Sequence, residues 1–333
     1  MSNEPGDRKR SLQRNGFVVR KERFYGRLIA ATAVLTILVT VGIILALSGR
    51  ALTFWSAVSP IAFFTGTEWS PIINETYGVL PLLSGTLIVT VGSALIALPI
   101  GLGAAIYLSE YASNRARGVL KPALEILAGV PTVIYGYMAL VYVTPLIDGV
   151  LPFSAQLVPP GVPVLPEFTF VMPSLRTFNA LSASIVVGIM IIPMVSSISE
   201  DALSAVPDSL REAGYGLGST KFDVSTKIVV PSATSGIVAS YVLAISRAIG
   251  ETMAVVMAMG MSPQMPYFPN VLRNLAESSQ TMTAAMVQIA SADSLGGVTY
   301  EAMFALGMTL FGITLIMNVL AELVRRRFRE TYQ

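Results

Sequence analysis

The chain has 333 residues, of which 53% are hydrophobic and only 13% are charged, and its formal net charge is +2. A soluble domain carries roughly twice that charged fraction, so this composition, with a mean hydropathy of +0.67, indicates an integral membrane protein. The sequence contains no Cys and no His, which excludes disulfides, Cys/His zinc sites, thiol nucleophiles and histidine triads. The small net charge gives no reason to expect nucleic acid as a partner.

The apolar residues gather in six runs, each long enough to cross a bilayer, which takes about 20 residues. In hydrocarbon only a helix or a closed barrel satisfies every backbone group. The chain is therefore predicted to be an all-α integral membrane protein with six transmembrane helices. Their predicted bounds are Leu28–Leu47, Leu82–Leu108, Ala123–Ile147, Ala180–Ile198, Ala233–Met261 and Thr299–Val324.

The polar tail Met1–Arg27 precedes the first run, and we expect its basic cluster to set topology and to contact anionic lipid. The first run is too long for the apolar part of a signal peptide and lacks a convincing cleavage site, so it is predicted to stay as a helix. Pro99, Pro131 and Pro193 interrupt three later runs. They indicate either kinked helices around a pathway or kinks that neighbouring helices simply tolerate.

Lys and Arg residues are distributed unevenly between the two sides that six spans define. The tail 1–27 holds eight of them, the segments 109–122 and 199–232 hold three each, and the end 325–333 holds four. The opposite side holds only Arg50, Arg176 and Arg273. Because basic residues stay in the cytoplasm, both termini are predicted to be cytoplasmic, as an even number of spans also requires.

Three predicted external segments differ in character. Ser48–Leu80 contains Trp55 and Trp69, which suit an interfacial position. Asp148–Asn179 is rich in proline and predicts an ordered, extended cap. Ser262–Val298 contains a short apolar piece, Thr281–Ala292, that predicts an interfacial or re-entrant helix. No internal repeat is evident, so the sequence gives no support to an inverted-repeat secondary transporter.

The segment 199–232 is the one long loop on the predicted cytoplasmic side. It reads Glu212-Ala213-Gly214, then Gly218, then Ile228-Val229-Val230-Pro231. Pro207 followed by Asp208 predicts a helix start, and the glycines from Gly214 to Gly218 allow a close turn. A second helix is predicted from Thr220 to just before Pro231. Such a helix–turn–helix could transmit a push without deforming, or it could be an ordinary connection with turn glycines.

Two charges lie within the fifth run, Arg247 and Glu251. In one continuous helix they are a turn apart on the same face, with Arg247 close to the bilayer midplane, where a charge is costly and faces a bundle interior or a wet cavity. Two interpretations stay open. The pair could merely neutralise itself and hold the bundle together, or Arg247 could meet a passing anion while Glu251 tunes or replaces that contact. Among other acids, Glu125 is predicted to pair with Lys121, and Glu301 lies near the outer end.

The loop spacing resembles the docking loop of the membrane subunits of ATP-binding-cassette importers, with Gly214 standing where that motif commonly has a second Ala. Arg247–Val255 resembles the fifth-span signature of the C-type permease subunit of phosphate importers, and Gly129–Gly136 resembles its third-span motif. The likeness covers about Val79–Val324. It implies the type I importer permease fold, with a first helix and external segment (28–78), a permease core (79–324) and a basic end (325–333).

The resemblance also implies partners: an A-type permease subunit, two copies of a cytoplasmic ATPase that carries ATP–Mg, and an extracytoplasmic phosphate-binding protein. The chain would then need no cofactor of its own. Glu212, Ala213, Gly214, Gly218, Ile228 and Pro231 would serve ATPase docking, and Arg247 with Glu251 would form a substrate pathway or gate.

Phosphate is favoured on two grounds. Sulfate and molybdate permeases usually have Phe-Gly after the Gly-Glu pair, where this chain has Thr252-Met253. A carboxylate beside Arg247 could accept a hydrogen bond from a P–OH group, which sulfate lacks at neutral pH. A permease for sulfate, molybdate or tungstate remains an alternative, as does an anion transporter or channel that needs no ATPase. An intramembrane enzyme has no support, because the paired intramembrane aspartates or His cluster it would need are missing.

Overall fold

The computed structural model describes residues 16–150, 175–268, 270–292 and 296–327. The first part of the predicted basic tail, most of the predicted proline-rich cap and the end of the chain from residue 328 lie outside these ranges. The described part is helical apart from one short two-stranded sheet. Its helices are α2 (Gly16–Ala57), α3 (Pro60–Thr65), α4 (Leu80–Ile106), α5 (Asn114–Ala128), α6 (Thr132–Met138), α7 (Thr144–Val150), α8 (Ala180–Ser204), α9 (Asp208–Gly216), α10 (Lys221–Val224), α11 (Val230–Ser232), α12 (Thr234–Ile249), α13 (Met253–Met259), α14 (Val271–Ala276), α15 (Met282–Ser291) and α16 (Gly297–Arg327).

Three π-helical turns continue these helices: η1 (Tyr107–Tyr111) after α4, η2 (Ala139–Val143) between α6 and α7, and η4 (Ser225–Val229) between α10 and α11. The antiparallel strands β1 (Trp69–Ser70) and β2 (Thr76–Tyr77) pair Trp69 with Tyr77.

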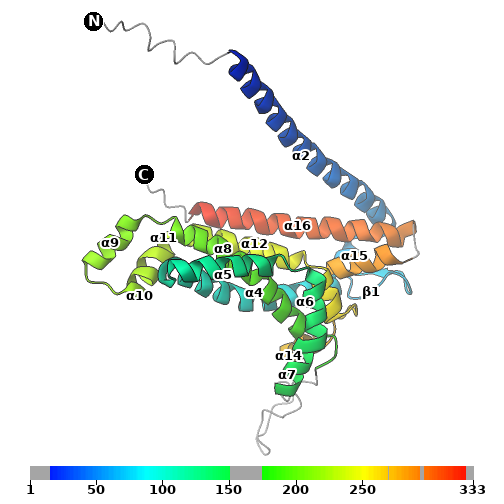
Figure 1. The fold of residues 1–333 in the computed structure, drawn as a ribbon. Helices are drawn as coiled ribbons and strands as arrows, with labels where there is room; N and C mark the ends of the chain where they lie inside the picture. Colours follow the sequence, from blue (N-terminus) through cyan, green and yellow to red (C-terminus); the bar gives the residue numbers. More distant parts are fainter. Residues whose placement is uncertain (1–15, 151–174, 269, 293–295, 328–333) are drawn as a thin grey trace, which may run out of the picture.

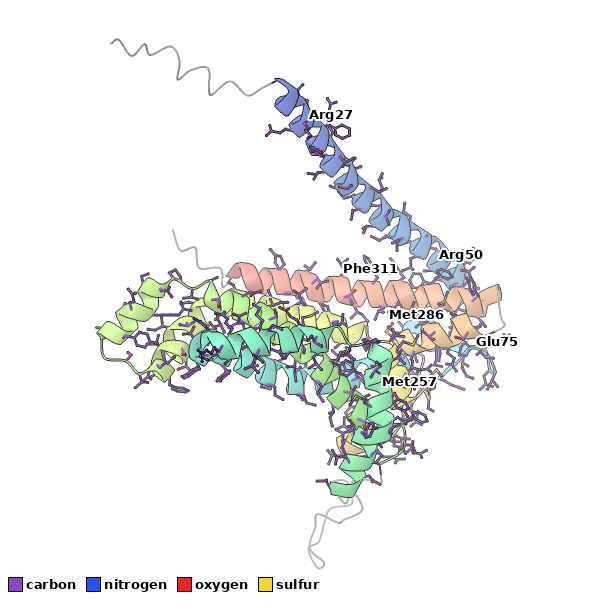
Figure 2. All side chains as sticks on the ribbon, viewed as in Figure 1. Arg27, Arg50, Glu75, Met257, Met286 and Phe311 are labelled. Atoms are coloured by element: carbon purple, nitrogen blue, oxygen red, sulfur yellow. The ribbon has the colours of Figure 1, made fainter. Side chains whose placement is uncertain are left out.

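Figure 1 shows α4, α5, α8, α12 and α16 running in roughly one direction, with α9 and α10 at one end and α15 and β1 at the other. The segment α6–α7 runs across that direction. The helix α2 meets α16 only at one end and then diverges from the bundle; Figure 2 places Arg50 at the joined end of α2 and Arg27 near its free end. This arrangement places α9 and α10 of the segment 199–232 at the opposite end of the bundle from α15 and β1, which belong to two of the predicted external segments.

Within the described residues, five helices are long and apolar enough to cross a membrane, or six if one bent pair counts as a span. The bent pair is Lys221–Ser232 with Thr234–Ile249, which meet at 71°. The multi-span prediction is thus confirmed in outline, while several bounds change. The first helix reaches Ala57 rather than Leu47, and the fourth reaches Ser204 rather than Ile198.

Two predicted spans are not continuous helices. In the third, α5 ends at Ala128 and α6 begins at Thr132, so Gly129, Val130 and Pro131 form a break. Pro131 lacks an N–H and disfavours a helical conformation in the residue before it, which accounts for the break. Pro99 and Pro193 instead stay inside α4 and α8. In the fifth, the helix stops at Ile249 and resumes at Met253.

The core of the bundle is built on α4 and α8. Small buried residues of both helices meet there, including Ala97, Ala183 and Val187. A methyl group added at Gly101 would lie 2.7 Å from Val195 Cβ, so the absence of a side chain lets the two helices approach closely. Close packing of small residues is what holds helices together in lipid, where no hydrophobic force drives their association.

The end opposite α9 is closed by a small aromatic cluster. Phe54 of α2 lies edge-on to Phe63 and Tyr77, with ring centroids 5.5 and 5.4 Å apart, and Tyr77 contacts Trp69. Trp69 is only 4% exposed, because its ring packs against Tyr77 inside the cluster. Its interfacial position stays a prediction. The short helix predicted at Thr281–Ala292 is confirmed as α15, which packs against α4 and α16 and donates the Met282 N–H to Thr86 Oγ1 at 3.1 Å.

Candidate docking loop and transport pathway

The two helices of the loop touch where the sequence has Gly214. A methyl group at this buried position would lie 2.7 Å from Ile228 Cδ1 and 2.9 Å from Val224 Cγ2. The missing side chain therefore lets α9 lie directly against α10 and η4. This contact gives a physical reason for the spacing between Gly214 and Ile228, and for glycine where the motif commonly has alanine.

The turn between the helices depends on Gly218. Its φ of +79° lies in the left-handed region that glycine adopts without strain. Gly218 N–H donates to Tyr215 C=O at 2.9 Å, and Ser219 N–H donates to Gly214 C=O at 3.2 Å, which closes the carboxyl end of α9. The predicted glycine turn is thus a helix C-terminal cap.

The second helix begins with its own cap. Thr220 Oγ1 accepts a hydrogen bond from Asp223 N–H at 3.2 Å. The Lys227 ammonium, 2.6 Å from Asp223 Oδ1, and the Thr220 hydroxyl hold the pKa of the Asp223 carboxyl below its usual range. Pro231 opens α11, after which the chain turns by 71° into α12. The loop is accordingly a closed helix–turn–helix with satisfied ends.

Several side chains of the loop face outward. Glu212, Ala213, Gly218 and Pro231 are exposed, whereas Gly214 is buried and Ile228 half-buried between the helices. The six predicted docking residues therefore divide into an outer surface and an inner contact that shapes it. Two apolar side chains on that surface were not among the predicted docking residues: Leu217 is 88% exposed and Phe222 is 66% exposed. Large apolar residues at a helix turn, flanked by Glu212, were the available signal for a partner-binding surface.

The second candidate site is the break in the fifth span. Arg247 lies in the last turn of α12 and is exposed, while Glu251 follows the helix end at Ile249 and is 8% exposed. Glu251 Oε1 accepts the Ala254 N–H at 3.2 Å and so caps α13, and the Glu251 carbonyl accepts a hydrogen bond from Thr283 Oγ1 at 2.8 Å. Among the described residues, no carboxylate forms an ion pair with Arg247. The predicted placement on one helical face is wrong because the helix ends between the two residues.

Other predicted acids also find different partners. Lys121 does not pair with Glu125; its ammonium lies 2.6 Å from Glu200 Oε2 and 3.1 Å from Asp201 Oδ1 of α8. Glu301, predicted near the outer end, binds Arg50 at 2.7 Å and joins α16 to α2. No group of acidic residues that could hold a metal ion occurs within the described ranges.

Arg247 is exposed, which makes its guanidinium available to a ligand or to a partner chain. Counted along the sequence, Arg247 lies near the middle of the stretch from α12 through α13. Inside a membrane, a guanidinium needs protein, water or an anion around it rather than lipid. Its planar fork is suited to oxyanions. Taken together, the apolar helices and the projecting helix–turn–helix are those of a multi-pass membrane protein.

Comparison with known proteins identifies the family. Residues 97–330 match the family described as "Binding-protein-dependent transport system inner membrane component", and the chain belongs to it. The chain is 31% identical to the "Probable ABC transporter permease protein YqgH" of Bacillus subtilis over 306 residues, 91% of this chain and 90% of that protein. It is 35% identical over 314 residues to the "Phosphate transport system permease protein PstC" of Xylella fastidiosa, covering 92% and 91%. The protein of that name from Haemophilus influenzae is 33% identical over 311 residues, covering 90% and 92%.

Solved structures agree on the fold. A chain of a bacterial alginate ABC transporter, in complex with a pentasaccharide-bound periplasmic protein, superposes with a TM-score of 0.58 at 15% identity and covers 95% of this chain and 98% of its own. A chain of the inward-facing MetNI methionine ABC transporter gives a TM-score of 0.52 at 15% identity, with 79% and 100% covered. The fold is therefore that of a type I ABC importer permease, and the chain is a transport subunit rather than an enzyme.

Proposed function

We propose that this chain is one of two membrane permease subunits of an ATP-driven importer that moves inorganic phosphate into the cytoplasm. The observation that carries the proposal is Arg247: an exposed guanidinium, without a described carboxylate partner, in the last turn of α12 where the predicted fifth span breaks. The stretch around it, Arg247–Val255, resembles the signature of phosphate permeases. Two relatives at 33–35% identity are named for phosphate transport.

The exposure of Arg247 supports a second chain that covers the surface on which this side chain lies. A charge on a lipid-facing surface at the centre of a membrane costs about 2.5–3.5 kcal/mol on insertion scales. A related subunit of the A-type that covers this face, leaving a wet path between the two chains, removes that cost. Each permease then contributes half of the pathway, and Arg247 supplies a cation where the anion loses its water.

Glu251 has a separate part in this scheme. Its carboxylate caps α13 and is largely buried, so Arg247 makes the first contact with the anion and Glu251 acts as the tuning or gating group. Movement of α13 would release the carboxylate from the Ala254 N–H. A freed carboxylate accepts a hydrogen bond from a protonated phosphate oxygen but repels fully ionised sulfate, which favours phosphate.

The remaining partners follow from the loop. Two copies of a cytoplasmic ATPase, with ATP–Mg bound on those chains, would dock one on each permease, here on the surface formed by Glu212, Ala213 and Gly218. Gly214 and Ile228 hold that surface together, and Pro231 leads it into α12. An extracytoplasmic phosphate-binding protein would deliver substrate at the end that carries α15. The assembly would lie in the plasma membrane of a prokaryote.

The decisive experiment is transport by sealed vesicles that contain the assembled complex. Uptake of labelled phosphate that requires ATP and is not competed by sulfate, molybdate or tungstate supports the proposal. Competition by those oxyanions assigns the chain to the alternative substrates. Uptake that continues without ATP and without the ATPase chain would identify a secondary transporter or channel instead.

A further inference from the structure

A buried ion pair ties the loop to the end of α4. Arg211 of α9 places Nη2 2.9 Å from Glu110 Oε1, and its Nε lies 3.3 Å and 3.4 Å from the two oxygens of the same carboxylate. The two side chains are 14% and 4% exposed. The hydrogen bond that Arg211 donates to Glu110 raises the pKa of the Arg211 guanidinium above its ordinary value. This is a two-pronged contact between α9 and η1.

The same guanidinium also holds the end of α8. Arg211 Nη2 donates to Leu203 C=O at 2.9 Å, and Nη1 donates to Val206 C=O. One side chain thus joins three segments that are separate in sequence: the last turn of α8, the first turn of α9 and the π-helical turn at the end of α4.

A second contact reaches the same turn from the other helix of the loop. Lys221, the first residue of α10, lies with its ammonium 5.0 Å from the centre of the Tyr111 ring. Because Glu110 and Tyr111 are neighbours in η1, both helices of the loop are attached to the same end of α4 (Figure 1).

Attachment alone does not require these charges. Apolar residues already pack the loop onto the bundle, with Val206 and Val224 in one cluster with Ala105 of α4. A buried ion pair adds little net stability, because removing both charges from water costs about as much as their attraction returns. What an apolar contact does not supply is direction, since packed helices can slide, whereas a guanidinium–carboxylate fork fixes orientation.

We propose that the Arg211–Glu110 pair is the coupling link of this subunit, through which a displacement of the docking helix α9 reaches α4. Arg211 is a positioning residue: it contacts neither substrate nor nucleotide. The inference rests on the proposed function only in that an ATPase must move the loop. It adds which membrane helix receives that movement and through which side chains.

The test measures geometry and coupling separately in the complex, reconstituted with its ATPase in lipid. The chain has no Cys, so single cysteines at exposed Ser209 on α9 and Tyr107 on η1 accept spin labels for distance measurement. The variants are Arg211→Lys, Arg211→Met and Glu110→Gln. Arg115→Met is the matched control, because Arg115 is exposed on α5 and no described carboxylate pairs with it.

We expect one narrow Ser209–Tyr107 distance distribution in the parent, unchanged between nucleotide-free and ATP-bound states, since the two segments move together. In Arg211→Met and Glu110→Gln the distribution should broaden and shift with nucleotide. Molecules imported per ATP hydrolysed should fall about tenfold, while the ATPase still copurifies. Arg211→Lys keeps the charge but not the planar fork, so its distance distribution and its import per ATP should lie between those of the parent and those of Arg211→Met. Arg115→Met should match the parent.

An unchanged distribution in any assembled variant of the pair overturns the proposal, as does broadening without loss of coupling. If none of the three variants assembles, the pair serves folding and the proposal is equally overturned. The distance measurement does not depend on the transported substrate. A parent complex that imports another anion while showing the rigid distance therefore contradicts the phosphate assignment and leaves the coupling link standing.

Discussion

Arg247 and Glu251 are four residues apart, yet they do not pair: α12 ends between them, Arg247 stays exposed, and Glu251 accepts the Ala254 N–H at 3.2 Å instead. One continuous helix would have placed the two residues side by side as a self-neutralising pair. Because of this break, the two residues, predicted to share one helical face, have different surroundings. Arg247 is available to a ligand or partner, and Glu251 holds the start of α13.

The orientation of the chain is the first testable prediction. Ile73 is 84% exposed near β1, and Asn114 is exposed at the start of α5. A single cysteine at Ile73 should react with a membrane-impermeant maleimide in intact cells, whereas one at Asn114 should react only after permeabilisation. The sequence contains no Cys to interfere. Labelling of Asn114→Cys from outside would invert the topology.

The loop offers a matched pair of glycines for the second prediction. A methyl group meets nothing within 4 Å at either Gly216 or Gly218, but only Gly218 has a positive φ, of +79°. Gly218→Ala should therefore destabilise the turn by about 1–2 kcal/mol and weaken copurification of the ATPase. Gly216→Ala should leave both unchanged. Equal behaviour of the two variants would show that backbone strain at residue 218 does not matter.

The contact beneath Gly214 gives the third prediction. Gly214→Val places a branched side chain against Ile228, whose Cδ1 is already 2.7 Å from a methyl group at this position. Overpacking of this kind costs about 1–3 kcal/mol, and it should separate α9 from α10 and release the ATPase. A Gly214→Ala, Ile228→Val variant, in which a smaller added group faces a shortened neighbour, should keep docking. If the double variant fails to bind the ATPase while Gly214→Ala alone binds it normally, a steric role for the contact between residues 214 and 228 is ruled out.

Features that neighbouring residues determine could be predicted from the sequence, whereas features that distant residues determine could not. Membrane spans and the helix–turn–helix are readable, because hydrophobic length, Pro207 and Gly218 act through neighbouring residues. The break at Gly250 is not readable from the apolar run, which looks the same on both sides. Within the break, the Glu251 carbonyl accepts a hydrogen bond from Thr283, which lies 32 positions further along the chain.

Ion pairs between distant residues could likewise not be predicted from the sequence. Helical spacing suggested Lys121 with Glu125, since residues four apart share a face. The structure joins Lys121 to Glu200, 79 positions away, because a carboxylate that is 1% exposed must find a cation wherever the packing brings one. The spacing of residues along a single sequence does not indicate such a distant partner. The fold had to place α5 beside α8 first.

The last prediction concerns the anion path. A hydrogen bond to a charged group contributes about 1.5–3 kcal/mol, so Arg247→Ala should lower phosphate uptake at least tenfold, roughly what 1.4 kcal/mol corresponds to. Arg247→Lys should rescue poorly, because an ammonium does not reproduce the planar fork. Arg115→Ala, an exposed arginine without a described carboxylate partner, is the control and should transport normally.

Combining Arg247→Gln with Glu251→Gln decides what the two charges are for. A glutamine carbonyl can still accept the Ala254 N–H, so Glu251→Gln should keep α13 in place and mainly alter the preference between phosphate and sulfate. Because no ion pair joins the residues, removing Glu251 relieves nothing at Arg247, and the double variant should assemble yet remain inactive. Phosphate uptake by the double variant near that of the parent would mean that the charges serve only each other, and Arg247 would then have no place on the anion path.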